Sequence, residues 1–238
     1  MRPEFQLVSP QDGTQAPRNT RVRVAIFELG SKAPAISLRD ADGAAVAAKR
    51  EILELNGLRI VELTPKRTLT AGSSFEVRVG DESAGSFTTT KLKDRAAPVW
   101  KGVAVATFVK EDKTATTTSP DGSKIRIIRT ESTCFRPDPY AVLEIEEAQD
   151  DSLVLFGVWF PDDKGKLHTK AAPLMYLYPK DGRLSLGSNS ICDPIQFAFP
   201  TVQRKLKIAV AAIDVAGNRS KVATVTLDLR KPASRPPE

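Results

Sequence analysis

The sequence has few of the residues on which most catalytic and metal sites depend. Its 238 residues include one histidine, two cysteines and two tryptophans, and only 6% are aromatic. A single histidine excludes every mechanism that uses two. The cysteines have neither a C-x-x-C spacing nor a nearby histidine from which to build a zinc site. A glycine-rich phosphate loop, a G-x-S-x-G elbow and a metal-binding helix motif are also absent.

These absences predict a protein that is not an enzyme, with no catalytic residues, no metal ligands and no cofactor. A glycosidase that relies on two carboxylates carries no local signature, so it stays open as the enzymatic alternative. No run approaches the roughly 18 apolar residues of a membrane-spanning helix, so we expect no membrane span. The hydrophobic fraction of 41% is that of an ordinary globular protein.

Positive charge is in excess but is not concentrated. Lysine and arginine total 35 against 29 acidic residues, a net charge of +6. Residues 1–93 hold 14 basic and 11 acidic side chains, and residues 94–238 hold 21 and 18. Each part is therefore only +3, with both signs interspersed, whereas nucleic-acid binding needs clustered cations. We expect a mixed solvated surface and no nucleic-acid partner.

The two cysteines, Cys134 and Cys192, either form a disulfide or remain free thiols. A disulfide would close a loop of about 58 residues and contribute about 4 kcal/mol in the chain-entropy model. We favour the disulfide, which implies an oxidising compartment. Met1 is followed by Arg2, Pro3 and Glu4 without the apolar segment of a signal peptide. The expectation is therefore a mature fragment whose targeting segment lies outside this sequence, with a cytoplasmic chain as the alternative.

Short alternating runs dominate the first 90 residues. In Thr20–Glu28, Val22, Val24 and Ile26 share one side and Arg21, Arg23 and Ala25 the other, which is the pattern of a half-buried strand. Residues 44–55 also suit a helix, but Asn56-Gly57 favours a hairpin because it supplies the positive φ values of a type I′ turn. About seven strands in 90 residues have the spacing of a small β-sandwich.

The second half repeats this pattern with longer loops. Strands are expected at residues 100–109, 124–129, 140–146, 153–160, 174–178, 195–199, 205–213 and 222–229. The predicted fold class is all-β, with two tandem immunoglobulin-like β-sandwich domains of which the second is larger. The predicted boundaries are a first sandwich at 1–92, a linker at 93–98, a second sandwich at 99–230 and a disordered tail at 231–238.

Several segments of the first half carry a family resemblance. They are Ser9-Pro10-Gln11-Asp12-Gly13, Asn19-Thr20-Arg21-Val22, Leu38-Arg39-Asp40-Ala41-Asp42-Gly43, Leu63-Thr64-Pro65 and Leu69-Thr70-Ala71-Gly72-Ser73-Ser74-Phe75-Glu76-Val77. With these segments, residues 1–90 resemble bacterial immunoglobulin-like domains of surface-layer and other envelope proteins. The second half resembles an immunoglobulin-like or fibronectin type III domain through its end, residues 211–220.

The first half also resembles the periplasmic copper-binding immunoglobulin-like family. That family holds its metal through an N-terminal histidine and further histidines, and here no histidine precedes residue 168. The resemblance therefore does not imply a copper site.

Three aromatic residues are candidates for binding a sugar or a protein. Tyr176 and Tyr178 share one face of a predicted strand, opposite Met175 and Leu177, and exposed tyrosines are efficient anchors. Trp100 follows the linker, where it would close the joint between the domains or join a binding surface. The alternative for the tyrosines is that they cover an edge of the sandwich. Trp159 lies in so apolar a strand that we expect it in the core.

The remaining chemical candidates are interpreted as structural. His168 lies in a charged segment without an identifiable nucleophile or orienting carboxylate, which indicates a solvated loop residue. Carboxylate pairs occur at Asp40/Asp42, Asp150/Asp151 and Asp162/Asp163, but the calcium-loop pattern is absent. A calcium site between the domains or at a loop cluster stays open as an alternative.

The resemblance and the exclusions together predict a non-catalytic scaffold, adhesion or assembly module in a bacterial envelope. Its expected location is the periplasm, the cell surface or the secreted fraction, and its expected partner is another envelope or surface protein, contacted through a sheet edge or a loop cluster. The alternative function is a carbohydrate- or cell-wall-binding module, with a glycan held by Tyr176, Tyr178 and Trp100.

Overall fold

The computed structural model describes residues 4–27, 34–55, 58–109, 114–118, 124–128, 140–162, 164–187 and 204–230. Every regular element in these ranges is a β-strand, as the alternating runs predict. Within them, no helix has the length and apolar character that a membrane crossing requires. Cys134, Cys192, the expected strand at 195–199 and the tail at 231–238 lie outside the described residues, so the disulfide, that strand and the tail's disorder stay predictions.

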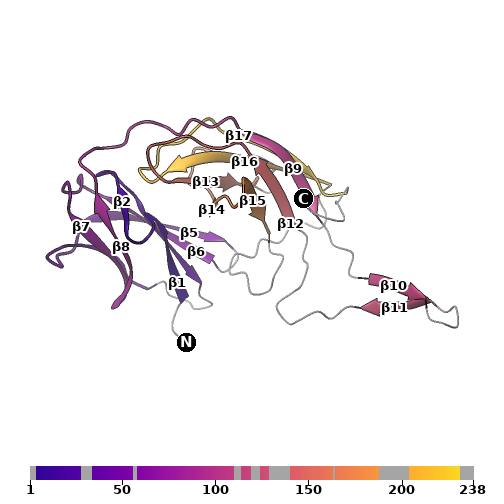
Figure 1. The fold of residues 1–238 in the computed structure, drawn as a ribbon, viewed down its shortest axis with the longest axis horizontal. Coiled ribbons are helices and arrows are strands. Elements are labelled where there is room, and N and C mark those ends of the chain that lie inside the picture. Colours follow the sequence, from indigo (N-terminus) through magenta and orange to yellow (C-terminus); the bar gives the residue numbers. More distant parts are fainter. Residues whose placement is uncertain are drawn as a thin grey trace.

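The first eight strands form a sandwich of two four-stranded sheets (Figure 1). Their bounds are β1 (Glu4–Ser9), β2 (Thr14–Ala16), β3 (Val22–Phe27), β4 (Ile36–Asp40), β5 (Ala48–Leu55), β6 (Leu58–Pro65), β7 (Ser74–Val79) and β8 (Glu82–Thr89). The sheet orders are β1-β3-β6-β5 and β2-β8-β7-β4. This pairing places β1, β3, β6 and β5 as strands A, B, E and D, and β4, β7 and β8 as C, F and G, of an immunoglobulin-like domain.

Two details of this sandwich bear on the sequence predictions. Leu55 is paired with Leu58, so β5 and β6 form the antiparallel hairpin that Asn56-Gly57 predicts, rather than a helix. Strand β2 was not expected; it pairs in parallel with β8, and its three residues are too few to show an alternating pattern. The valines and isoleucine of β3 face the core together with residues such as Val61, Val77 and Phe87.

The later strands form a second sandwich and a separate hairpin. Their bounds are β9 (Val103–Val109), β10 (Thr114–Thr118), β11 (Lys124–Ile128), β12 (Tyr140–Ile145), β13 (Val154–Trp159), β14 (Met175–Leu177), β15 (Arg183–Leu186), β16 (Lys205–Asp214) and β17 (Ala223–Asp228). The sheets run β15-β12-β9 and β14-β13-β16-β17. Strand β15 was not predicted, although Leu184 and Leu186 are buried. The β10–β11 pair projects away from both sandwiches in Figure 1.

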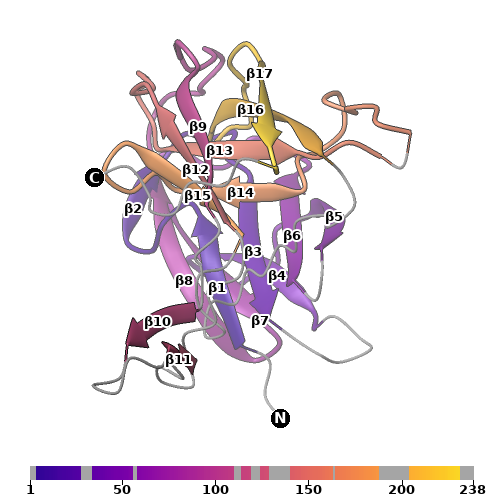
Figure 2. The same cartoon turned by 90° about the vertical axis from the view of Figure 1, so that its right-hand side faces the viewer.

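The chain is thus an all-β protein of two immunoglobulin-like sandwiches in tandem, because β13, β16 and β17 pair in the order of strands C, F and G. The sandwiches meet face to face. Figure 2 shows β13 and β14 running across β3 and β6. Residues of both sandwiches share one buried apolar cluster at this contact, so the interface is continuous with the packing of each domain.

Candidate functional site

The apolar layer between the domains combines small and branched side chains with two large aromatic ones. The first domain contributes Val8, Ala25 and Ile60, and the second contributes residues of β13, β14 and β16, among them Leu155, Trp159 and Tyr176. All of these side chains are buried. The outer face of sheet β1-β3-β6-β5, expected to be solvated, is instead covered by the second domain.

A charged network crosses this interface. Glu62 on β6 accepts a hydrogen bond from Arg23 Nε at 2.8 Å and one from Arg21 at 3.0 Å. The hydroxyl of Tyr176, from the second domain, donates to the same carboxylate at 3.3 Å. The guanidinium of Arg23 lies 4.7 Å from the centre of the Tyr176 ring, a cation–π distance. The network therefore binds a tyrosine of one domain to an ion pair of the other.

Burial shapes the ionisation of this network. Arg23 is 1% exposed and Glu62 is 3% exposed. Burial on its own raises the pKa of Glu62, but attraction by Arg23 and Arg21 and their hydrogen bonds outweigh it, so that the pKa is lowered. Burial also raises the pKa of Tyr176. A charged pair that is removed from water in this way is costly to break from one side.

The structure changes the interpretation of the three aromatic candidates. Tyr176 and Tyr178 do share a face, since Met175 and Leu177 pack in the second domain's own core. That face is covered by the first domain, where the hydroxyl of Tyr178 donates to the carbonyl of Val8. Burial raises the pKa of Tyr178 to about 12. The two tyrosines are interface residues and not exposed anchors.

Trp100 lies in the core of the second domain rather than at the joint. Its indole N–H donates to the carbonyl of Glu146 at 2.9 Å, and its ring packs edge-on against Phe156 with centroids 5.3 Å apart. Trp159 is buried, but in the layer between the domains and not in the second domain's own core, and it donates to the carbonyl of Ala171 at 3.0 Å. The exposed aromatic surface required for the glycan alternative is therefore not formed by Tyr176, Tyr178 or Trp100.

A turn of the second domain rests on the start of β3. The carbonyl of Val215 accepts from the backbone N–H of Arg21 at 2.8 Å and from the hydroxyl of Thr20 at 3.2 Å. Gly217 in this turn has a φ of +88°, and a Cβ there would collide with the Arg21 side chain. Glycine is thus favoured chiefly by the backbone conformation, and a Cβ there would also displace the end of the Arg21 side chain.

Three carboxylates converge beside this turn. The side-chain oxygens of Asp94, Asp150 and Asp214 lie within 4.8 Å of one another, and Asp214 is buried. Burial is the main cause that raises the pKa of Asp214 to about 6; hydrogen bonds from Asn218 lower it, and Asp94 and Asp150 raise it. Carboxylates are ligands that Ca²⁺ accepts, but it takes six to eight oxygens. The cluster by itself does not define a metal centre.

The raised pKa predicts a pH effect on stability. The folded chain keeps the Asp214 proton up to about pH 6, whereas the unfolded chain releases it near the ordinary aspartate pKa of 3.8. Stability contributed by the protonated form is therefore lost as pH rises from about 4 to 6.5, by about 2–3 kcal/mol. Asp214→Asn should raise the melting temperature more at pH 7.5 than at pH 4. If Asp214→Asn changed the melting temperature equally at pH 4 and pH 7.5, the raised pKa of Asp214 would be contradicted.

The control for this measurement is Asp151→Asn, an exposed neighbour that should leave the pH profile unchanged. The same melting curves test the expectation that no metal binds. With millimolar Ca²⁺ at pH 7.5, we expect the melting temperature of the native protein to stay within its experimental error. A rise that Asp214→Asn abolishes would favour the calcium alternative instead.

His168 lies where the sequence indicates, in an exposed charged loop. Its Nε2 is 2.9 Å from a carboxylate oxygen of Asp162. The other oxygen of Asp162 accepts from the backbone N–H groups of Lys164 and Lys166 at 3.0 and 2.8 Å. These hydrogen bonds organise a turn, which is the role that an aspartate commonly has in such a loop.

Comparison with known proteins gives only remote likenesses. No protein-family model and no curated protein matches the sequence. The N-terminal Ig1-2 module of the Drosophila receptor protein tyrosine phosphatase DLAR is 13% identical, with a TM-score of 0.30 over 96% of this chain and 100% of that one. A pullulanase from Anoxybacillus sp. is 10% identical, with a TM-score of 0.29 over 89% and 24% of the two chains. L,D-transpeptidase 3 from Mycobacterium tuberculosis is 19% identical, with a TM-score of 0.26 over 64% of this chain and 68% of that one.

The immunoglobulin-like assignment rests on the strand pairing and not on these likenesses. The interface network and the aspartate cluster were both missed by sequence reasoning. The signal for the network was present as Arg21 and Arg23 on one side of a strand, but charged residues on a strand's second face ordinarily meet water. The aspartates come from three separate segments, and no local pattern connects them.

Proposed function

We propose that this chain is a non-catalytic module of a bacterial envelope that makes protein–protein contacts through the edge strand β9. The observation that carries the proposal is the uncharged edge of β9. Strand β9 is hydrogen-bonded to β12 on one side; β17 packs near it, but no described strand other than β12 pairs with it. An unpaired edge presents N–H and C=O groups that another chain can extend.

The contrast between β9 and β5 supports this choice. Strand β5 is also at a sheet edge, but it carries Lys49, Arg50 and Glu51, the kind of charge that blocks edge pairing. Strand β9 reads Val-Ala-Val-Ala-Thr-Phe-Val without a charged residue. Val105 on β9 is 47% exposed, so an apolar side chain is presented to solvent beside the open edge.

The domain interface supports a scaffold role. Leu155 and the Arg23–Glu62–Tyr176 contacts fix one sandwich against the other through packing and hydrogen bonds. A partner bound along β9 would therefore be held at a defined position relative to the first domain. The envelope location follows the resemblance of residues 1–90 to envelope domains and the expected Cys134–Cys192 disulfide.

The test is a pair of matched lysine substitutions. Val105→Lys should weaken capture of a partner protein from envelope extracts by about tenfold or more, because a charged side chain on an edge strand disfavours the pairing of an added strand. Ile52→Lys on β5 is the control, since Ile52 is exposed to a similar degree, 45%. Capture and depletion onto insoluble wall material are measured in parallel by mass spectrometry. Equal capture by both variants, or depletion onto wall material alone, would overturn the proposal.

A further inference from the structure

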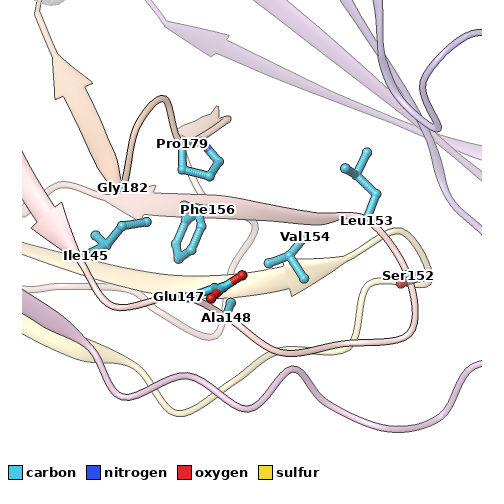
Figure 3. Close-up of a pocket in the computed structure, with 9 residues that line it drawn as sticks. All are labelled: Ile145, Glu147, Ala148, Ser152, Leu153, Val154, Phe156, Pro179 and Gly182. Carbon is cyan, nitrogen blue, oxygen red and sulfur yellow. The ribbon is translucent and has the colours of Figure 1, made fainter.

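A solvent-open cavity of about 550 Å³ lies in the second domain, where β12 ends and β13 begins. Its floor is the buried Phe156, and its apolar walls include the half-buried Ile145, Val154 and Leu153 (Figure 3). The volume falls within the range of pockets that bind ligands. The cavity adjoins the start of β9, because Ile145 in its wall pairs with Val103, but no residue of β9 lines it.

One side chain gives the cavity a charge. Glu147 is exposed and is the only ionisable residue among those that line it, and Figure 3 shows its carboxylate beside Phe156 and Val154. Within the described residues, Glu147 forms no salt bridge, whereas Glu144 is paired with Arg183 at 3.6 Å. Ser152 adds a hydroxyl to the lining.

The surroundings of the cavity are acidic, although the whole chain is basic. Residues 144–151 contain five acidic residues and no lysine or arginine. Residues 179–183, on the opposite wall, contain Lys180, Asp181 and Arg183, a net charge of only +1. Residues 99–102, which hydrogen-bond to residues 146–149, add one further cation, Lys101, so the acidic residues still predominate. Ser152 connects the lining to the aspartate cluster through a hydrogen bond to Asp94 at 3.3 Å. The local field therefore favours a cation.

We propose that the cavity receives a lysine or arginine side chain of a partner polypeptide. The aliphatic stem of such a side chain would pack against Ile145, Val154 and Phe156 while its charged head pairs with Glu147, the arrangement that these amphipathic side chains favour. This inference rests on the proposed function, because it takes the occupant to be a second protein. It names a second contact, beside the start of β9, that selects partners by charge.

The experiment compares charged and neutral probes of the same shape. Butylguanidinium should produce saturable NMR shifts of the methyl groups of Ile145 and Val154, and the neutral butylurea should bind more weakly by about three- to fivefold, as expected for an exposed ion pair. In the Glu147→Gln variant, butylguanidinium and butylurea should bind with equal affinity. Glu146→Gln, an exposed neighbour that does not line the cavity, should preserve the difference. Equal binding of the two probes to the native protein would overturn the proposal.

A second arm distinguishes a polypeptide from a small cation. A capped Gly-Arg-Gly peptide should shift the same methyl groups at least as strongly as butylguanidinium, and its citrulline counterpart should be weaker. Binding of butylguanidinium without binding of the peptide would overturn the polypeptide occupant. Since Val105 does not line the cavity, failure of these probes with the Val105→Lys effect intact would remove only the cavity proposal. If Val105→Lys did not weaken capture of the partner protein, the proposed function itself would be overturned.

Discussion

Replacing Glu62 with alanine should lower the free energy of unfolding at pH 7 by about 3–5 kcal/mol, because it leaves a buried arginine without its carboxylate. Arg23 is nearly inaccessible and its Nε donates to Glu62. Its terminal nitrogen Nη1 has no hydrogen-bond partner among the described residues. Cation–π contact with Tyr176 cannot replace the ion pair, since such contacts contribute about 2 kcal/mol when desolvated. Urea denaturation followed by circular dichroism measures the loss.

The matched control is Glu76→Ala. Glu76 pairs with Arg78 at 3.4 Å on a half-exposed face, so its loss should cost less than about 1 kcal/mol. The double substitution Arg23→Met with Glu62→Leu should recover most of the stability, because it removes both charges together. A cost below about 1 kcal/mol for Glu62→Ala would show that Arg23 reaches water without its partner.

The ion pair also has a predicted pH dependence. In the folded chain, Arg23 and Arg21 lower the pKa of Glu62 below the ordinary glutamate value of 4.5. Its contribution is therefore fully present above about pH 4.5 and is lost as pH falls through the lowered folded value. This direction is opposite to that of Asp214, whose contribution declines as pH rises toward 6. The two groups can thus be separated in one pH series.

Truncating Leu155 to alanine should also destabilise the protein, by about 2–5 kcal/mol. Leu155 lies in the apolar layer between the sandwiches and is 0% exposed. Its removal leaves a cavity that two sheet faces from different domains cannot easily close. We expect the calorimetric transition to move to lower temperature and to broaden or divide, because the domains lose part of the contact that couples their unfolding.

Leu92→Ala provides the comparison, since Leu92 is 75% exposed in the connection between the domains. Its substitution should change stability by less than about 0.5 kcal/mol. If Leu155→Ala were equally mild, the contact between the sandwiches would contribute little to the stability of either. Scanning calorimetry of both variants at one protein concentration makes the distinction.

Local sequence signals were sufficient for the elements and for much of the core. The alternation of Val22, Val24 and Ile26 predicted a strand with one face in the core, and these residues are buried. The shared face of Tyr176 and Tyr178 was also correct. A side chain's face follows from its position parity in the strand, so it can be inferred from a few neighbouring residues.

Short elements and long-range groups were not predictable in this way. Strand β2 has three residues, fewer than a pattern needs. Asp94, Asp150 and Asp214 belong to separate segments and meet only after both sandwiches have formed. In the sequence, Glu147 is one of several acidic residues in a run. Only the structure shows that Glu147, unlike its neighbour Glu146, lines the cavity beside Phe156.

The sequence by itself determined that this protein is built from strands, where most of them run, and which of their faces enter the two cores. Only the tertiary structure decided what covers the second face of β3 and β14, and therefore that Arg23 and Tyr176 are buried partners rather than surface residues. The physical reason is that alternation separates two faces of a strand but does not record what each face contacts. That contact is supplied by a sheet from the distant part of the chain.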